Sequence, residues 1–259
     1  METIVLLRGL LRDSRHWGDF PARLQEQLPG CEVLCLDLPG NGERNKERSP
    51  SSISAMVESL RSQLSPAQQA AGIHLLTISM GGMIGSSWAS QYPAEVKSLC
   101  MMNASFADIS PFYRRLKPKH YPRILRLFFM GARALQKEQF ILQATSLKHP
   151  RDLALAHQWA TFAKQYPVNI RNALRQLWAA ARFRISAHKP DIPMLVLNGG
   201  ADELVHPSCS MAISLYWHLP LRSQPFAGHD LPLDAGDWVC RQLQHWYGKV
   251  MPASQETSA

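Results

Sequence analysis

The sequence around Ser79 constrains the fold more than any other stretch of the chain. Residues 73–77 form a short apolar run that ends in a β-branched residue, which is typical of a buried strand, and residues 83–92 have the spacing and composition of a helix. A turn of a few residues, containing Ser79 and Gly81, joins the two. Such a sharp turn lifts a serine hydroxyl clear of the sheet and directs the first N–H groups of the helix at whatever the serine attacks. The pattern therefore makes Ser79 a candidate nucleophile.

One residue departs from the usual form of this turn. Nucleophilic serines on such turns commonly have glycine two positions before and two positions after them, because the strand and helix backbones pass close together. Gly81 supplies the second glycine, but Thr77 occupies the first position. Because an ordinary tight turn between a strand and a helix fits the same residues, the motif alone leaves a catalytic and a structural role open for Ser79.

The rest of the chain alternates between strand-like and helical patterns. Six short apolar segments are predicted as strands, at residues 3–7, 32–36, 73–77, 96–102, 193–197 and 221–226. Helical patterns occur at residues 16–28, 53–64, 83–92 and 235–247. This alternation favours a parallel sheet with right-handed crossovers, and strands that are mostly apolar along their length indicate a sheet covered on both faces. In such sheets, functional sites lie at the carboxyl ends of the strands.

The composition is compatible with a soluble α/β domain that carries an insertion. The chain has 259 residues, of which 46% are apolar. Its five cysteines are an odd number without the spacing of metal ligands, which indicates free thiols in a reducing compartment. The first residues lack the pattern of a signal peptide, and no apolar run reaches membrane-spanning length. We expect a cytoplasmic protein that uses neither a metal nor another cofactor.

Three residues that follow separate strands form a chemically complete set. Ser79 follows the third predicted strand, Asp202 lies in the loop after the fifth, and His229 follows the sixth. A serine hydroxyl is a poor nucleophile until a base accepts its proton, and a histidine can do this near neutral pH. A carboxylate behind the histidine would hold its tautomer and stabilise the imidazolium. The sequence therefore predicts a Ser79, His229 and Asp202 triad.

Neighbouring residues offer alternatives for two of these roles. His206 lies beside the proposed acid and is a rival for the base, while Glu203 and Asp230 are rivals for the acid. Asp202 is favoured because it lies two residues after the glycine pair that ends the fifth strand.

The order of these residues resembles that of the α/β-hydrolase superfamily. Each of Ser, Asp and His comes in the loop after a separate strand, and the turns at residues 37–42 and 228–229 support the likeness, which covers nearly the whole chain. The resemblance implies an α/β-hydrolase fold of about six parallel strands, with helices on both faces and an inserted helical cap.

The resemblance also implies a division of the chain. Residues 1–107 and 191–250 would form the core domain, residues 108–190 the cap, and residues 251–259 a frayed tail.

The loop after the first strand would complete the catalytic site. In the superfamily, backbone N–H groups hold the oxyanion, and on this chain the matching residues are Leu10 and Met80. Gly9 lies beside them and is expected to contact substrate. Arg8 stands where the superfamily usually has histidine before this glycine. Arg8 either forms a structural ion pair or faces an anionic group of the substrate.

The segment at residues 108–190 carries the basic charge of the chain. It holds 16 Lys and Arg residues against three acids, a net charge of +13, whereas the remainder has a net charge of −5. Helical patterns lie at residues 122–136, 153–164 and 168–182, and aromatic residues including Trp159 are expected to fill the cap and line an acyl pocket.

The basic charge of this segment has three possible roles. It forms a solvated face, a docking surface for an acidic acyl carrier protein, or a surface for an anionic membrane. The segment is similar to the cap of carboxylesterases such as the pimeloyl carrier-protein methyl ester esterases. No nucleic-acid recognition motif is present, so we expect no nucleic-acid partner.

These features predict a capped serine hydrolase that cleaves carboxylic esters or thioesters through an acyl-enzyme. One alternative is a non-hydrolytic lyase of the same fold that acts on a small polyanion, because Arg8 and the basic cap suit such a substrate. The other is a pseudo-enzyme whose cap binds an acidic partner. The residues leave the natural substrate open, since the fold fixes the machinery and the cap fixes the choice.

Overall fold

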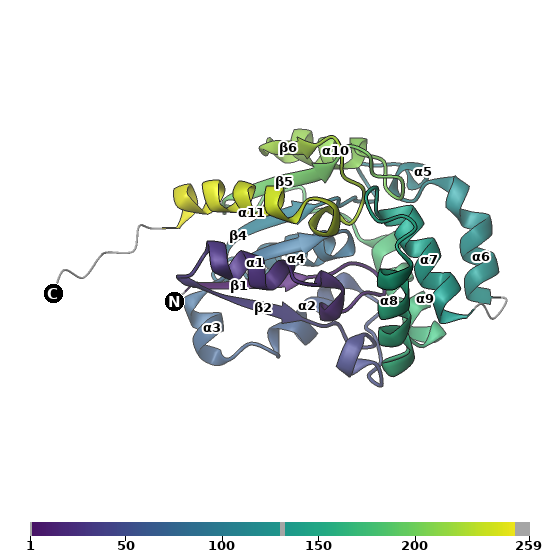
Figure 1. The fold of residues 1–259 in the computed structure, drawn as a ribbon. Helices are drawn as coiled ribbons and strands as arrows, with labels where there is room; N and C mark the ends of the chain where they lie inside the picture. The colour runs from purple at the N-terminus through teal and green to yellow at the C-terminus, as the bar shows by residue number, and fades with distance from the viewer. Residues whose placement is uncertain (1, 130–132, 252–259) are drawn as a thin grey trace.

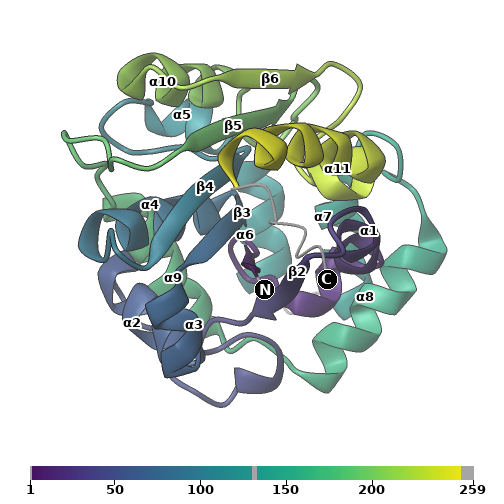
Figure 2. The same cartoon turned by 90° about the vertical axis from the view of Figure 1, so that its left-hand side faces the viewer.

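A computed structural model describes residues 2–129 and 133–251. Six strands form one sheet in the order β2-β1-β3-β4-β5-β6, and every neighbouring pair is parallel (Figure 2). The strands are β1 (Glu2–Leu7), β2 (Cys31–Leu36), β3 (Ile73–Ile78), β4 (Val96–Met102), β5 (Met194–Gly199) and β6 (Leu221–Gln224). The predicted α/β-hydrolase fold with six parallel strands is confirmed. The last strand is shorter than expected because Pro225, which cannot donate a hydrogen bond to a ladder, follows it.

Helices cover both faces of the sheet (Figure 2). On one face lie α1 (Phe20–Gln27) and α11 (Leu231–Val250), whose buried residues pack on the even positions of β1, such as Ile4 and Leu6. The opposite face is covered by α2 (Ile53–Arg61), α4 (Met80–Gln91) and α10 (Ser208–Trp217). The strands β1 to β5 therefore place apolar side chains on both sides of the sheet, whereas the edge strand β6 contributes only Leu221 to the core.

In the core, two helices were not predicted and one predicted helix is divided. The short α3 (Pro66–Ala71) and α10 were not predicted. Along α10, Met211 and Leu215 are exposed although apolar, so the helix has no polar face that the sequence could reveal. The predicted helix at residues 16–28 is divided into a 3₁₀ turn, Ser14–Trp17, and α1, because Gly18 between them has a φ of 58° that ends the first turn.

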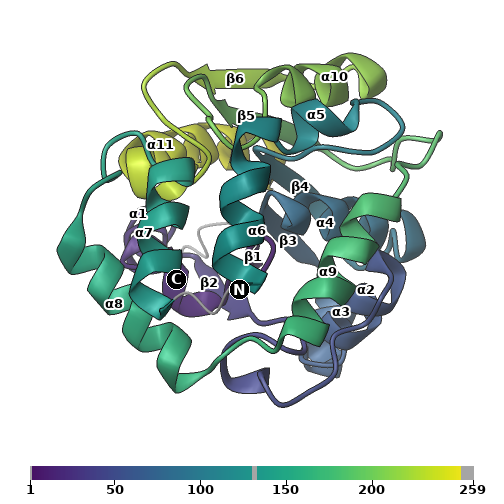
Figure 3. The ribbon, with the colours of Figure 1, turned by 90° about the vertical axis from the view of Figure 1, so that its right-hand side faces the viewer.

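In the described residues between β4 and β5, five α-helices lie at the carboxyl ends of the strands (Figures 1 and 3). We call them the inserted helices: α5 (Phe112–Arg115), α6 (Tyr121–Phe129), α7 (Ala134–Thr145), α8 (Leu153–Gln165) and α9 (Ile170–Arg182). The predicted helix at residues 122–136 corresponds to α6 and the start of α7, and residues 130–132 lie outside the described ranges. Most of α7 was not predicted, because the buried Glu138 interrupts its apolar face.

The predicted tail, apart from Met251, lies outside the described residues. All five cysteines are free thiols. Across residues 2–129 and 133–251, none of the helices combines the length and apolar character needed to cross a membrane.

Candidate active site

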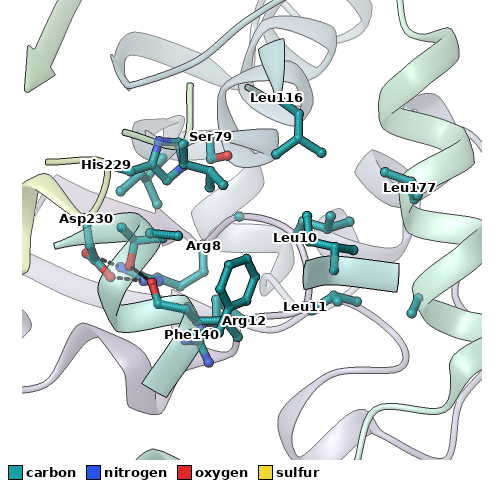
Figure 4. A pocket seen from close by; sticks show the side chains of 18 of the residues that line it. Arg8, Leu10, Leu11, Arg12, Ser79, Leu116, Phe140, Leu177, His229 and Asp230 are labelled. Carbon is teal, nitrogen blue, oxygen red and sulfur yellow. Dashed lines mark hydrogen bonds and ion pairs between the residues drawn. The ribbon is translucent and has the colours of Figure 1, made fainter. Parts of the chain in front are cut away.

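Ser79 occupies a strained turn between β3 and α4. Its φ of 57° lies in the left-handed region that non-glycine residues seldom adopt. The Ser79 N–H donates to the Met102 carbonyl at 2.9 Å, and the Ser79 carbonyl accepts from the Gly82 N–H at 2.9 Å. These bonds fix the turn to β4 and to the helix, and the serine side chain lines a cavity (Figure 4).

Two glycines allow other backbone segments to approach this turn. A Cβ atom on Gly81 would lie 2.5 Å from the Leu7 carbonyl oxygen, and one on Gly9 would lie 2.9 Å from the Ser79 Cβ. Neither distance is compatible with a side chain. The loop after β1 and the start of α4 therefore lie directly against the nucleophile turn, as the sequence predicted for Gly81.

Thr77 fits this turn because a glycine elsewhere makes room for it. Its side chain is buried, and its Oγ1 donates to the Cys100 carbonyl at 2.9 Å. A Cβ atom on Gly85 would lie 3.0 Å from the Thr77 Cγ2 and 2.7 Å from Leu99 Cδ1. The space that the usual glycine provides in the strand is supplied here by Gly85 on α4.

His229 and Asp202 form a buried pair opposite Ser79. The His229 Nδ1 lies 2.7 Å from an Asp202 carboxylate oxygen, and the other oxygen of Asp202 accepts from the N–H groups of Leu204 at 2.9 Å and Val205 at 2.8 Å. An acceptor at Nδ1 favours the tautomer that leaves Nε2 free to take a proton. Figure 4 shows the His229 imidazole beside the Ser79 hydroxyl, and both residues line the same cavity.

The structure places the rival residues elsewhere. The His206 Nδ1 lies 2.8 Å from the Ser208 hydroxyl in an exposed turn. Glu203 is exposed and pairs with Lys119, and Asp230 pairs with an arginine. Of the three carboxylates considered, only that of Asp202 forms a hydrogen bond with the His229 ring, and its role as the orienting acid stays a prediction.

Asn103 at the end of β4 also shapes the site. It has a φ of 48°, its side-chain nitrogen donates to the His229 carbonyl at 2.7 Å, and its oxygen accepts from the Gly199 N–H at 2.9 Å. These bonds tie the His229 loop to the end of β5. The sequence analysis did not assign Asn103 a role, although asparagine directly after a buried strand is a signal for such a position, because it tolerates the left-handed region.

The inserted helices contact the histidine loop directly. The buried Asp234 accepts hydrogen bonds from the Gly228 N–H at 2.6 Å and the Leu147 N–H at 2.7 Å. The Asp230 N–H donates to the Thr145 carbonyl at the end of α7 at 2.8 Å. The position of α7 is therefore coupled to the loop that carries His229.

Arg8 forms a buried, two-pronged ion pair with Asp230. Its terminal nitrogens donate to the two carboxylate oxygens at 3.0 and 2.6 Å, and its guanidinium lies 4.8 Å from the Trp17 ring centroid. Burial raises the pKa of Asp230, but the charge and hydrogen bonds of Arg8 outweigh burial and hold this pKa below its usual value. Because both terminal nitrogens are occupied, the structure favours the ion-pair interpretation of Arg8.

The predicted oxyanion donors, the N–H groups of Leu10 and Met80, lie on either side of the Ser79 turn. Within residues 2–129 and 133–251 the Leu10 N–H has no acceptor, and Leu10 lines the cavity. Met80 is the first residue of α4, a position whose N–H has no partner inside the helix. Leu10 follows Gly9 and Met80 follows Ser79 in the chain, so both N–H groups lie close to the Ser79 turn. Their role as oxyanion donors stays a prediction.

The cavity joins the candidate catalytic residues to an apolar wall. It has a volume of about 250 Å³. On one side lie Gly9, Leu10, Ser79 and His229, and the inserted helices contribute Ile124, Phe140, Ile141, Ala144, Thr145, Ile170, Ala173, Leu174 and Leu177. Such a lining suits an apolar chain with few polar groups to orient it.

Trp159 does not line this cavity, which corrects the sequence-based expectation. The side chain on α8 is 3% exposed and packs with Leu142 and Ala156, and the Arg12 guanidinium lies 4.4 Å from its ring centroid. The sequence showed that the helix is amphipathic, but not which neighbour its aromatic face meets.

Among the described residues, no three His, Cys, Asp or Glu side chains gather closely enough to hold a metal ion.

Known proteins provide an independent comparison. A model of the alpha/beta hydrolase family matches residues 4–242. Pimeloyl-[acyl-carrier protein] methyl ester esterase of Neisseria meningitidis serogroup B (strain MC58) is 27% identical over 220 residues, which are 80% of this chain and 77% of the esterase. Lipase 1 of Psychrobacter immobilis is 37% identical over 108 residues, which are 40% of this chain but only 32% of the lipase.

Solved structures share the fold. A thermophilic esterase from Thermogutta terrifontis superposes with a TM-score of 0.76 at 19% identity, over 97% of this chain and 91% of that one. The enol-lactonase from Burkholderia xenovorans LB400 gives a TM-score of 0.76 at 16% identity, over 95% and 91% of the two chains.

Proposed function

The chain belongs to the alpha/beta hydrolase family, and we propose that it is a serine hydrolase that cleaves carboxylic esters or thioesters. The observation that carries the proposal is the buried pair of His229 and Asp202 beside Ser79 on its strained turn. The esterase and the lipase among the relatives support the same class of reaction.

The proposed reaction begins with attack of the Ser79 Oγ on the substrate carbonyl carbon. The His229 Nε2 accepts the serine proton, and Asp202 stabilises the resulting imidazolium. The carbonyl oxygen becomes an oxyanion, which the N–H groups of Leu10 and Met80 would bind. When the carbon–oxygen or carbon–sulfur bond breaks, His229 returns the proton to the leaving alcohol or thiol, and the acyl group remains on Ser79.

A water molecule then hydrolyses the acyl-enzyme, again with His229 transferring the proton. His229 takes a proton from water, the hydroxide attacks the acyl carbonyl, and the bond to Ser79 breaks as the proton returns to the serine oxygen. The products are the carboxylic acid and the free enzyme. We propose that the inserted helices form a cap, residues 108–190, that seats the acyl group against the apolar wall of the cavity.

A panel of p-nitrophenyl esters of increasing chain length tests this proposal. We expect release of p-nitrophenol with burst kinetics, and a kcat/KM that rises with chain length until the 250 Å³ cavity is filled. A Ser79→Ala protein should lose activity by several orders of magnitude. Full activity in that variant would refute the proposal.

We also propose that an acidic acyl carrier protein can deliver the acyl group. The net charge of +13 on residues 108–190 supports this, and so does the likeness to an esterase named for a carrier-protein ester. Exposed cations such as Arg126 on α6 and Arg171 on α9 lie on the helices that line the cavity. The kcat/KM for a carrier-linked ester should fall steeply with salt, whereas that for a p-nitrophenyl ester should not. Equal salt dependence would contradict carrier docking.

The two alternatives are not favoured by the relatives. A lyase would release products without consuming water, and a pseudo-enzyme would bind a partner without turnover. Product analysis in ¹⁸O-labelled water separates them from a hydrolase, because only hydrolysis places one labelled oxygen in the acid product.

A further inference from the structure

Two buried arginines line the cavity, and they differ in how their hydrogen-bond donors are used. Both terminal nitrogens of Arg8 are taken by the carboxylate of Asp230. The Arg12 Nη1 donates to a Glu138 oxygen at 2.7 Å and lies 2.9 Å from the His16 Nε2. Only 10% of the Arg12 side chain is exposed. Its Nη2 is buried, yet it has no hydrogen-bond partner among the described residues.

The Arg12 guanidinium is held in place by several neighbours. It stacks over the Trp159 ring at 4.4 Å from the centroid, and Glu138 on α7 fixes its other arm. A buried N–H of a charged group without an acceptor is costly, and an acceptor supplied by a ligand would remove that cost. The unpartnered nitrogen is therefore a positioned donor, since the side chain cannot easily turn away.

Arg12 lies where two cavities meet. The cavity that contains Ser79 and a second cavity of about 230 Å³ share five lining residues, Leu11, Arg12, Ile141, Ile170 and Ala173. The second cavity is more polar and includes His16 and Glu138. Figure 4 shows Arg12 apart from Ser79, next to Phe140. A chain that starts at the serine can thus extend along an apolar wall and reach Arg12.

Two carboxylates near Arg12 are already paired with other arginines. Although burial raises the pKa of Asp230, Arg8 and also the charge of Arg12 lower it, and this carboxylate is bound through both oxygens to Arg8. Asp13 is already bound through both oxygens to Arg15. Burial, together with the charge of Arg12, lowers the pKa of His16 to about 4, so that this ring is neutral at pH 7. Glu138 contacts one guanidinium nitrogen, and the other is buried without a hydrogen-bond partner among the described residues.

We propose that Arg12 binds a carboxylate at the distal end of the acyl chain, so that the preferred substrates are esters of dicarboxylic acids with one free carboxylate. The inference rests on the proposed hydrolase function, because it assumes that the scissile carbonyl lies at Ser79. A guanidinium with one unpaired nitrogen in a mostly apolar pocket is the type of group that sets the orientation and selectivity of a ligand.

Matched pairs of p-nitrophenyl esters test this inference. Each pair has the same number of acyl carbons, from four to ten, and differs only in a terminal methyl or a terminal carboxylate. For the wild-type protein we expect the ratio of kcat/KM, carboxylate over methyl, to peak above about tenfold at one chain length. Arg12→Met should lower that peak ratio by roughly 10- to 100-fold.

Three further variants isolate the contribution of Arg12 to this ratio. Glu138→Gln removes the competing carboxylate and should raise the ratio. The double variant Arg12→Met with Glu138→Gln leaves no unpaired charge in the pair, so it keeps the test valid if Arg12→Met alone does not fold. Lys164→Gln removes an exposed cation of α8 that lines neither cavity, and it should leave the ratio unchanged.

The same pairs of acyl chains can be prepared as methyl esters. Their binding to a Ser79→Ala protein, measured by calorimetry, gives a readout without turnover. The inference is overturned if the wild-type protein cleaves the aliphatic esters but shows no preference for a terminal carboxylate at any length. It is also overturned if the preference survives Arg12→Met. If neither kind of ester is cleaved, the hydrolase proposal fails, and a carboxylate preference in the binding data that is lost in Arg12→Met would still support the Arg12 site.

Discussion

The two sides of the cavity are built differently. On the side of the sheet, the polar groups around the proposed reaction have fixed partners: Asp202 accepts from His229 and from two backbone N–H groups, and Asn103 holds the histidine loop. On the side of the inserted helices, the wall is mostly apolar, and Glu138 of α7 pairs with Arg12 from the loop after β1, whose Nη2 has no hydrogen-bond partner among the described residues. The contrast supports the proposal that the core fixes the machinery for the chemistry, while the inserted helices and Arg12 select the substrate.

Asp202→Asn should produce the largest effect on activity, because it alters the contact with His229 on the side of the sheet. The Asn oxygen can still accept from Leu204 and Val205, but an amide nitrogen would face the His229 Nδ1 and favour the wrong tautomer. We expect kcat to fall by about 10,000-fold with little change in KM. Glu203→Gln is the matched control, since Glu203 is exposed and pairs with Lys119 instead of His229. A fall of less than tenfold for Asp202→Asn would remove Asp202 from the triad.

Gly9→Ala should have the next largest effect. The new Cβ would lie 2.9 Å from the Ser79 Cβ and 3.3 Å from its Oγ, so the serine or the loop after β1 must shift. We expect kcat for p-nitrophenyl esters to fall about 100-fold. Gly30→Ala is the control, because a Cβ there meets no atom within 4 Å. Unchanged kcat in Gly9→Ala would show that this loop does not position the reacting groups.

Acid should lower the stability of the protein through protonation of His16, which lies beside Arg12. Burial and the charge of Arg12 lower the pKa of His16 to about 4 in the folded protein, from 6.5 when unfolded, so the unfolded state takes up a proton first as the pH falls. Stability from this group is present above pH 6.5 and is lost as the pH falls towards 4. Between pH 7 and pH 5 the loss is about 2 kcal/mol.

Urea unfolding of wild type and His16→Gln at the two pH values measures this loss. Asp37 acts in the opposite direction, because burial and the charge of Asp13 raise its pKa to about 6, so that its ionisation lowers stability as the pH rises. The comparison of the two proteins cancels that contribution. The same pH dependence in both would contradict the assignment to His16.

Leu177→Asn should have the smallest effect and should change selectivity alone. Leu177 lines the cavity from α9 and is 47% exposed, so its loss costs little folding energy. We expect kcat/KM to fall about fivefold for a ten-carbon acyl ester, through KM, and to change little for a four-carbon ester. Trp178→Gln serves as the control, because the neighbouring Trp178 is exposed and does not line the cavity. Equal losses for both chain lengths would contradict an acyl wall at α9.

The sequence predicted the features that depend on local patterns. The strands β1 to β5 follow from apolar runs, and the positions of Ser79, Asp202 and His229 follow from the rule that sites lie at strand ends. Thr77 looked like a defect in the motif, and the structure shows that Gly85, eight residues later, makes room for it.

Features that depend on long-range partners were not predictable in the same way. The partner of Arg8 is Asp230, 222 residues later, and only the packing of the loops brings them together. Trp159 was expected in the cavity, because the sequence does not specify which neighbour an aromatic helix face meets; in the structure it supports Arg12 instead. The Arg12 Nη2 is left unpaired because Glu138 holds Nη1. Glu138 is buried on α7, where it interrupts the apolar pattern of the helix in the sequence.

Labelling with a fluorophosphonate probe, mapped by peptide mass spectrometry, tests the central claim most directly. The probe reacts with a serine that a histidine activates. The account predicts modification of Ser79 alone, no modification of Ser79→Ala, and labelling that is slowed strongly in Asp202→Asn. Labelling of a different serine, or an unlabelled Ser79 in folded protein, would contradict the claim that Ser79, His229 and Asp202 form the catalytic site.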